Sequence, residues 1–184
     1  MSTMTLALML SLGLVAQSGE APAPKPVDLV GKVKEVGGGP AGRAQAVLTL
    51  DDGSEWILYG ADPEAQGELV RLSGVRAQVR GTLGDPRLPG NNAVMVQRYQ
   101  IVDIGKGVVP RIGHLASLLL DGKTRLLFVD EEGTAELLPD GYAEKLMKQV
   151  GAKLWMVGNK SGERFQPMRF AILRSGGLKK GAEQ

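Results

Sequence analysis

The only histidine of the chain, His114, is the residue best suited to acid–base chemistry near neutral pH. It lies in the segment RIGHLASLLLDG, directly after Gly113 and among aliphatic residues. A catalytic or metal-binding histidine needs partners, and the 184 residues contain neither a second histidine nor a cysteine. A serine nucleophile on a G-x-S-x-G turn is also missing from the sequence. We therefore expect His114 to be a solvent-facing strand residue, and we expect no catalytic residue, no metal site and no cofactor.

Three further stretches could bind ions or ligands. GGGPAG, from Gly37, lacks the lysine and the serine or threonine of a phosphate-binding loop. The acidic stretches DDGSE and DEEGTAE lack the alternating oxygen ligands of a calcium site, so we expect them to be hairpin turns. GDPRLPGNN, from Gly84, is a long loop and therefore a candidate contact loop, with a plain surface loop as the alternative.

The N-terminal segment has the pattern of an export signal. Its first eighteen residues carry no charge and include an apolar run from Leu6 to Val15, which is too short to span about 30 Å of hydrocarbon. Small residues follow the run, so residues 1–18 are interpreted as a signal peptide, although no lysine or arginine precedes the run. An uncleaved anchor and a core segment are the alternatives. Residues 19–26 are rich in proline and are expected to form an extended linker, and the mature protein is expected in the periplasm or outside the cell.

The charge is nearly balanced overall but unevenly distributed. The formal charge of +2 gives no strong field that would commit the whole molecule to a nucleic acid or an acidic membrane. Residues 27–104 hold eight Lys or Arg against ten Asp or Glu, whereas residues 105–184 hold thirteen against nine. The second half could therefore dock an anionic partner in a salt-sensitive way, with a solvated basic rim as the alternative. Its C-terminal basic residues are Lys160, Arg164, Arg169, Arg174, Lys179 and Lys180.

One pattern occurs twice along the chain. LVGKVKEV resembles RIGHLASL, VLTLDDGSEWIL resembles LLFVDEEGTAEL, GVRAQVRG resembles GAKLWMVG, and RYQIV resembles RFAIL. The four matches fall in the same order, at offsets of 82, 80, 77 and 71 residues. Collinear matches of this kind indicate an internal duplication, with convergent strand patterning as the alternative.

Each copy is predicted to contain five strands and one short helix. In the first copy, glycine bends the first strand, an Asp-Gly turn makes a hairpin, and Asp62 caps a helix that has Pro63 at its first position and Gly74 past its end. The predicted strands are 27–36, 47–50, 54–59, 75–83 and 93–104. The second copy repeats this scheme with Asp140, a helix from Tyr142, and Gly151 as its stop.

This order of elements resembles the OB fold, a five-stranded Greek-key barrel. The resemblance covers residues 27–104 and 109–174 and rests on architecture, since no family motif accompanies it. It implies a mainly β protein with two small five-stranded OB-like Greek-key barrels, each with a short helix between strands 3 and 4. Residues 175–184, which include Lys179 and Lys180, are expected to form a basic flexible tail. An SH3-like barrel, which usually lacks that helix, is the alternative.

The two tryptophans are the main candidates for a binding surface. Aligning the copies places Trp56 opposite Glu136 and Trp155 opposite Gln78, so we expect both tryptophans to point outward. An outward tryptophan can pack between the copies, contact a partner protein or stack on a ligand; an error in the alignment is a further alternative.

The register of the strand AKLWMV supports the outward position of Trp155. Leu154 and Met156 alternate with Lys153 and Trp155, and the first set is apolar in both copies, so Lys153 and Trp155 are expected on the outer face. The remaining candidate binding residues are Arg43, Arg76, Arg80, Asn91 and Asn92.

The expected function is that of an exported, non-enzymatic binding or adaptor module. Its expected partner is an envelope protein or an anionic envelope polymer, contacted through exposed barrel faces. Single-stranded nucleic-acid binding is the alternative, because OB folds often serve it. An aromatic content of 4% leaves few residues for base stacking, which argues against nucleic acid. The sequence indicates neither the ligand nor the oligomeric state.

Overall fold

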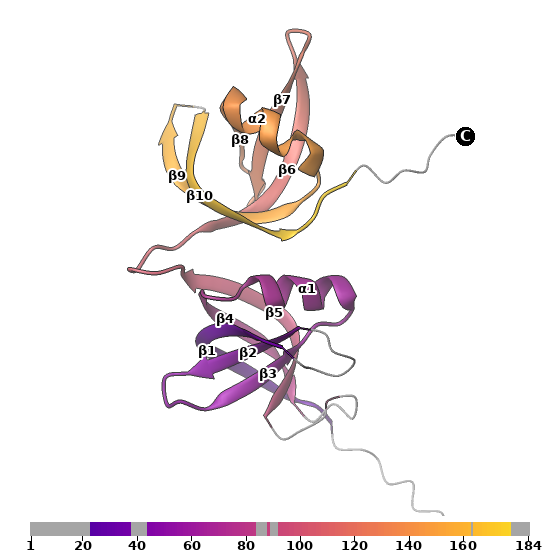
Figure 1. Cartoon of the computed structure of the whole chain (residues 1–184), viewed down its shortest axis with the longest axis vertical. Helices are drawn as coiled ribbons and strands as arrows, with labels where there is room; N and C mark the ends of the chain where they lie inside the picture. The colour runs from indigo at the N-terminus through magenta and orange to yellow at the C-terminus, as the bar shows by residue number, and fades with distance from the viewer. Residues whose placement is uncertain (1–22, 38–43, 84–87, 89–91, 163, 178–184) are drawn as a thin grey trace, which may run out of the picture.

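The protein consists of two closed five-stranded sheets that follow one another along the chain (Figure 1). A computed structural model describes residues 23–37, 44–83, 88, 92–162 and 164–177. The fold class expected from the sequence is confirmed: the protein is mainly β, with one five-stranded closed sheet and short helical segment in each half. None of the described helices is long and apolar enough to cross a membrane.

The first unit, residues 25–103, closes its sheet in the order β1-β2-β3-β5-β4, with β4 pairing back onto β1. Only the β3–β5 pairing is parallel among these strands. Its elements are β1 (Lys25–Val36), β2 (Gln45–Leu50), β3 (Glu55–Tyr59), α1 (Pro63–Arg71), β4 (Arg76–Leu83) and β5 (Ala93–Asp103). The first strand begins two residues before its predicted start, because Lys25 and Pro26 already pair with β4.

The second unit, residues 111–174, has the corresponding strand order, β6-β7-β8-β10-β9, with β9 pairing back onto β6. One parallel bridge, between Leu137 and Arg164, joins β8 to β10. Its elements are β6 (Arg111–Leu120), β7 (Lys123–Asp130), β8 (Ala135–Leu137), α2 (Asp140–Leu146), a 3-10 turn (Met147–Gln149), β9 (Lys153–Ser161) and β10 (Arg164–Arg174).

Matching glycines occupy the same tight contacts in the two units. A Cβ atom on Gly31 would lie 2.4 Å from the carbonyl oxygen of Thr49, and one on Gly113 would lie 2.2 Å from that of Val129. These glycines and their contacts are counterparts in the sequence alignment of the copies. The shared strand order and this shared backbone approach support the internal duplication.

The two helices follow the sequence prediction to different degrees. In α1 the Asp62 carboxylate accepts a hydrogen bond from the Ala65 N–H at 2.8 Å, as expected of an N-cap. In α2 the helix begins at Asp140, two residues before the predicted start at Tyr142. The N-cap residue is therefore Pro139 in place of the predicted Asp140, and no side chain caps the helix. The Asp140 carboxylate pairs with Arg125 on β7.

The hydrophobic core of the first unit continues into the second. The buried cluster around Leu48, Leu58 and Ile101 also contains Trp155 and Leu173, which belong to the second unit. A separate cluster, around Phe128 and the buried residues of β9, fills the second unit itself. The two units are therefore joined by a packed apolar contact, with α1 facing β10 across it (Figure 1).

Gly113→Ala should destabilise the protein by about 1–3 kcal/mol or more, because the new methyl group collides with the Val129 carbonyl oxygen. Gly141→Ala is the matched control: a Cβ there has no neighbour within 4 Å and its position lies in α2, where alanine is favoured over glycine. Denaturant unfolding measures both changes. Equal stability of the two variants would contradict the close approach at Gly113.

A candidate binding groove between the two units

Trp155 lies at the contact between the units. Its neighbours on β9, Leu154 and Met156, are buried in the core of the second unit, whereas Trp155 belongs to the cluster formed mainly by the first unit. Only 6% of Trp155 is exposed, and the Arg169 guanidinium lies 6.0 Å from the centroid of its ring. The outer face of β9 is thus covered by the sister unit, and Trp155 is not available as a surface anchor for another molecule.

The prediction that Trp56 points outward is wrong. Trp56 on β3 pairs with Leu48 and lies two residues before Leu58, and both leucines are fully buried. Because side chains alternate between the faces of a strand, Trp56 lies on the inner face and packs against the core of the first unit. The error arose from its counterpart Glu136, which is polar and yet buried. A polar residue in one copy therefore did not mark a solvent-facing position in the other.

An ionic cluster neutralises Glu136 inside the second unit. The Arg111 guanidinium donates to Glu136 at 2.5 Å and to Asp130 at 2.6 Å, and the Lys160 ammonium lies 3.1 Å from Glu136. The same guanidinium lies 5.4 Å from the centroid of the Phe128 ring, a favourable cation–π distance. The hydrogen bond from Arg111 lowers the pKa of Asp130 below the usual value. A buried carboxylate is tolerated here because two cations pair with it.

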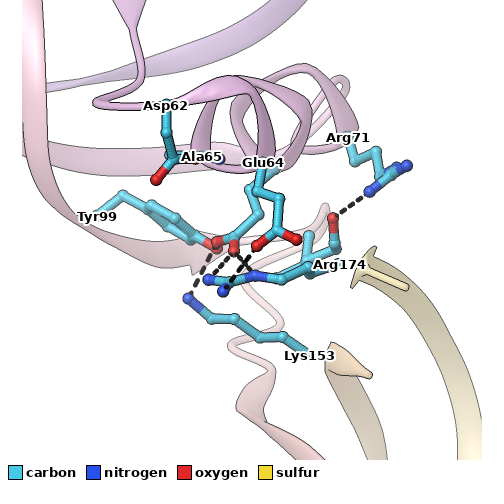
Figure 2. Close-up of polar contacts among 9 residues, drawn as sticks. Asp62, Glu64, Ala65, Arg71, Tyr99, Lys153 and Arg174 are labelled. Atoms are coloured by element: carbon cyan, nitrogen blue, oxygen red, sulfur yellow. Dashed lines mark hydrogen bonds and ion pairs between the residues drawn. The ribbon is translucent and has the colours of Figure 1, made fainter. Parts of the chain in front are cut away.

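A second buried carboxylate, Glu68, joins the two units. Glu68 lies on α1 and is 3% exposed. It accepts hydrogen bonds from the Tyr99 hydroxyl at 2.8 Å, from Lys153 Nζ at 3.1 Å and from Arg174 Nε at 2.5 Å. Figure 2 shows the side chains of Tyr99, Lys153 and Arg174 pointing toward one another. Tyr99 comes from the first unit, whereas Lys153 and Arg174 come from β9 and β10 of the second. We call these four residues the Glu68 cluster.

The surroundings of Glu68 keep it ionised. Burial raises its pKa, but the Tyr99 hydrogen bond and the charges and hydrogen bonds of Lys153 and Arg174 outweigh burial, so the pKa of Glu68 lies below its usual value. Burial and the hydrogen bond to Glu68 raise the pKa of Tyr99 far above the usual value, so its hydroxyl remains a donor. The Lys153 ammonium also lies 4.7 Å from the centroid of the Tyr99 ring.

Two further contacts support this joint. The Arg71 guanidinium on α1 donates to the backbone carbonyl of Leu173 at 2.7 Å. Arg174 also lies 3.4 Å from the exposed Glu64 carboxylate. One helix of the first unit therefore makes several polar contacts with the last strand of the second.

A cleft of about 730 Å³ opens beside the Glu68 cluster. Its walls come from both units, because α1 and β5 contribute one side and β6, β7, β9 and β10 contribute the other. A neighbouring cleft of about 590 Å³ shares several of its residues and extends toward Val109, in the segment between β5 and β6. We call the 730 Å³ cleft the inter-unit groove and define it by Arg98, Tyr99, His114, Glu131, Lys153 and Arg174.

His114 lies in this groove, exposed on β6 as expected from the sequence. Its counterpart in the first unit, Lys32, is exposed on β1. Among the residues that the structure describes, no group of three or more His, Asp or Glu side chains is arranged to hold a metal ion.

The other predicted binding residues do not gather at the groove. Arg76 pairs with Asp51 at 2.6 Å and Arg80 pairs with Asp28 at 2.8 Å, both on the first unit. Asn92 is exposed, and its backbone carbonyl accepts a hydrogen bond from Ile57. Arg43 and Asn91 lie outside the described residues.

Sequence reasoning placed Lys153 correctly on the outer face beside Trp155 but missed Glu68 and Tyr99. One sequence signal could have indicated Glu68. It lies four residues before Leu72 and next to Leu69, which places an acidic residue on the apolar side of α1.

Glu68→Gln should lower the free energy of unfolding at neutral pH by about 2 kcal/mol, because Lys153 and Arg174 lose their buried counter-charge. The pKa of Glu68 is lowered in the folded protein, so its contribution is present above the usual carboxyl range and is lost as the pH falls through the folded pKa. The stability difference between the native protein and the variant should therefore shrink in acid. Denaturant unfolding across this pH range measures it.

Glu64→Gln is the control, because Glu64 also contacts Arg174 but is exposed. A loss of stability for Glu64→Gln equal to that for Glu68→Gln, or a difference that does not change with pH, would contradict the role of the Glu68 cluster.

Comparison of the sequence with models of protein families found no match. Comparison with curated proteins found no match either.

Proposed function

We propose that this protein is an exported, non-catalytic binding module that holds a segment of a partner protein in the inter-unit groove. The observation that carries the proposal is the groove, whose two walls come from different units and are fixed to each other by the Glu68 cluster and by Trp155. A concave site between domains is a common place for a ligand. Because the joint is already packed and paired, a ligand would meet a preformed site and would not have to order it.

The charges in the groove favour a protein segment over an anionic polymer. Arg98 and His114 lie in the groove together with Glu131, while Lys153 and Arg174 already pair with Glu68. A polyanion lying along this surface would meet carboxylates as well as cations. A peptide can offer charges of both signs and backbone hydrogen bonds, so it complements such a mixed lining.

The strand order supports the OB-like interpretation. In each unit the first strand pairs with the second and the fourth, and the fifth strand lies between the third and the fourth. A five-stranded barrel with a helix after the third strand is the architecture of the OB fold. Function does not follow from architecture alone, so the ligand must be argued from the groove.

The same strand order keeps single-stranded nucleic-acid binding as the second candidate. Binders of this kind stack bases on exposed aromatic side chains. The chain has two tryptophans, three tyrosines and three phenylalanines, all within the described residues. Among them only Phe170 is exposed. Phe170 itself packs edge-on against Tyr142. This distribution favours the protein ligand.

A photo-crosslinking amino acid at position 114, in the full chain produced in its own host, should trap a protein partner. Position 32 is the matched control, because Lys32 is the exposed counterpart of His114 in the other unit and lies away from the groove. Arg98→Glu should reduce the adduct at position 114, because it reverses a charge in the groove.

Equal labelling at positions 114 and 32, or an adduct that Arg98→Glu leaves unchanged, would contradict the groove as the binding site. Binding of a fluorescent oligothymidine, measured by anisotropy and lost in Arg98→Glu, would favour the nucleic-acid alternative.

A further inference from the structure

The hairpin of β6 and β7 extends beyond the rest of the second unit, at the end far from the first unit (Figure 1). Strand β6 pairs with β9 from Arg111 to His114, and the Leu115 N–H and carbonyl make the last bonds on that side. Its pairing with β7 continues to Leu120. Among the described residues, the other edge of residues 116–120 therefore has no strand partner. We call this stretch the free edge of β6.

The free edge is apolar and exposed. Leu118, Leu119 and Leu120 are 47%, 71% and 42% exposed. Because side chains alternate along a strand, Leu119 lies on one face of the hairpin while Leu118 and Leu120 lie on the other, so the core of the unit does not account for them. Exposed edge strands usually carry charges or proline, or are very short. The sequence ASLLL of this edge has no such protection.

We propose that two copies of this chain associate through the free edge of β6, strand against strand and antiparallel, to make one sheet of β7 and β6 from each copy. The backbone sets the register. The Leu115 N–H and carbonyl point toward β9, so those of Ser117 and Leu119 point to the same side and are the groups available for pairing. A two-fold axis at Leu118 then pairs Ser117 with Leu119 of the second copy, and Leu119 with Ser117.

The charges select a second copy through β6 and disfavour pairing through β7. Pairing about Leu118 brings leucine against leucine and Leu120 against Ala116, with no charge among residues 116–120. The corresponding edge of β7 carries Lys123 and Arg125, and antiparallel self-pairing about Thr124 would bring these like charges together. A surface that is complementary to itself suits a two-fold dimer. The groove remains open, because it lies at the other end of the second unit.

A cysteine cross-link tests the register directly. The native chain contains no cysteine, so a single introduced thiol reports one contact. In the proposed dimer Leu118 faces its own counterpart in a non-hydrogen-bonded pair, where the Cα atoms lie about 4.5 Å apart, within the range of a disulfide. Oxidised Leu118→Cys should form a covalent dimer. Leu119→Cys is the matched control, because Leu119 is more exposed but faces Ser117 of the second copy.

A proline on the free edge tests the backbone pairing. Leu119→Pro removes an N–H that points away from β7, so the hairpin is retained while each dimer loses two hydrogen bonds. Its dimer should dissociate about thirtyfold more readily by sedimentation equilibrium. Leu119→Thr, which keeps the N–H and loses the leucine, separates the backbone contribution from that of the side chain and should weaken the dimer less.

Three results would overturn the proposal. The first is a monomeric native chain in sedimentation. The second is cross-linking of Leu119→Cys as efficient as that of Leu118→Cys. The third is a dimer that Leu119→Pro leaves unchanged while circular dichroism shows the variant to be folded.

Discussion

The arrangement of the two units depends on one buried carboxylate. Glu68 is only 3% exposed, so its charge in the folded protein requires Tyr99 from its own unit and two cations from the other. Those cations come from β9 and β10, the strands that also bring Trp155 and Leu173 against the first unit. The ionic and apolar contacts therefore coincide, and together they fix the walls of the groove.

The two units keep the same backbone plan while their interiors differ. Gly31 and Gly113 make the same close approach to the neighbouring strand, which holds that part of each sheet to the same path. At one pair of counterpart positions, the first unit has Trp56, which packs against its core, and the second has Glu136, which pairs with Arg111. The backbone contacts are therefore the same in the two units. The side chains at the counterpart positions differ, and the buried charge in the second unit is paired with cations.

Local sequence signals predicted the elements well, because the Asp62 cap, the Asp-Gly turn and the bending glycines act over a few residues. Strand alternation also placed Lys153 beside Trp155. Glu68 was missed because its partners Lys153 and Arg174 lie 85 and 106 residues further along the chain. The predicted orientation of Trp56 was wrong for a similar reason, because the burial of its counterpart Glu136 depends on Arg111, on another strand. The free edge of β6 exists because β9 pairs with β6 only from Arg111 to His114. The length of this pairing cannot be read from a local sequence pattern.

The central claim is that the two units form one body with a preformed groove, and a distance measurement between them tests it most directly. Spin labels on single cysteines at Glu55 and Glu144, exposed residues of the first and second unit, would be unique because the chain has no cysteine of its own. With the labelled protein diluted in an excess of unlabelled protein, so that a labelled copy pairs only with an unlabelled one, we predict a single narrow distance distribution by double electron–electron resonance. This distribution should broaden when Glu68 is replaced by alanine. A broad distribution in the otherwise native protein would contradict the account.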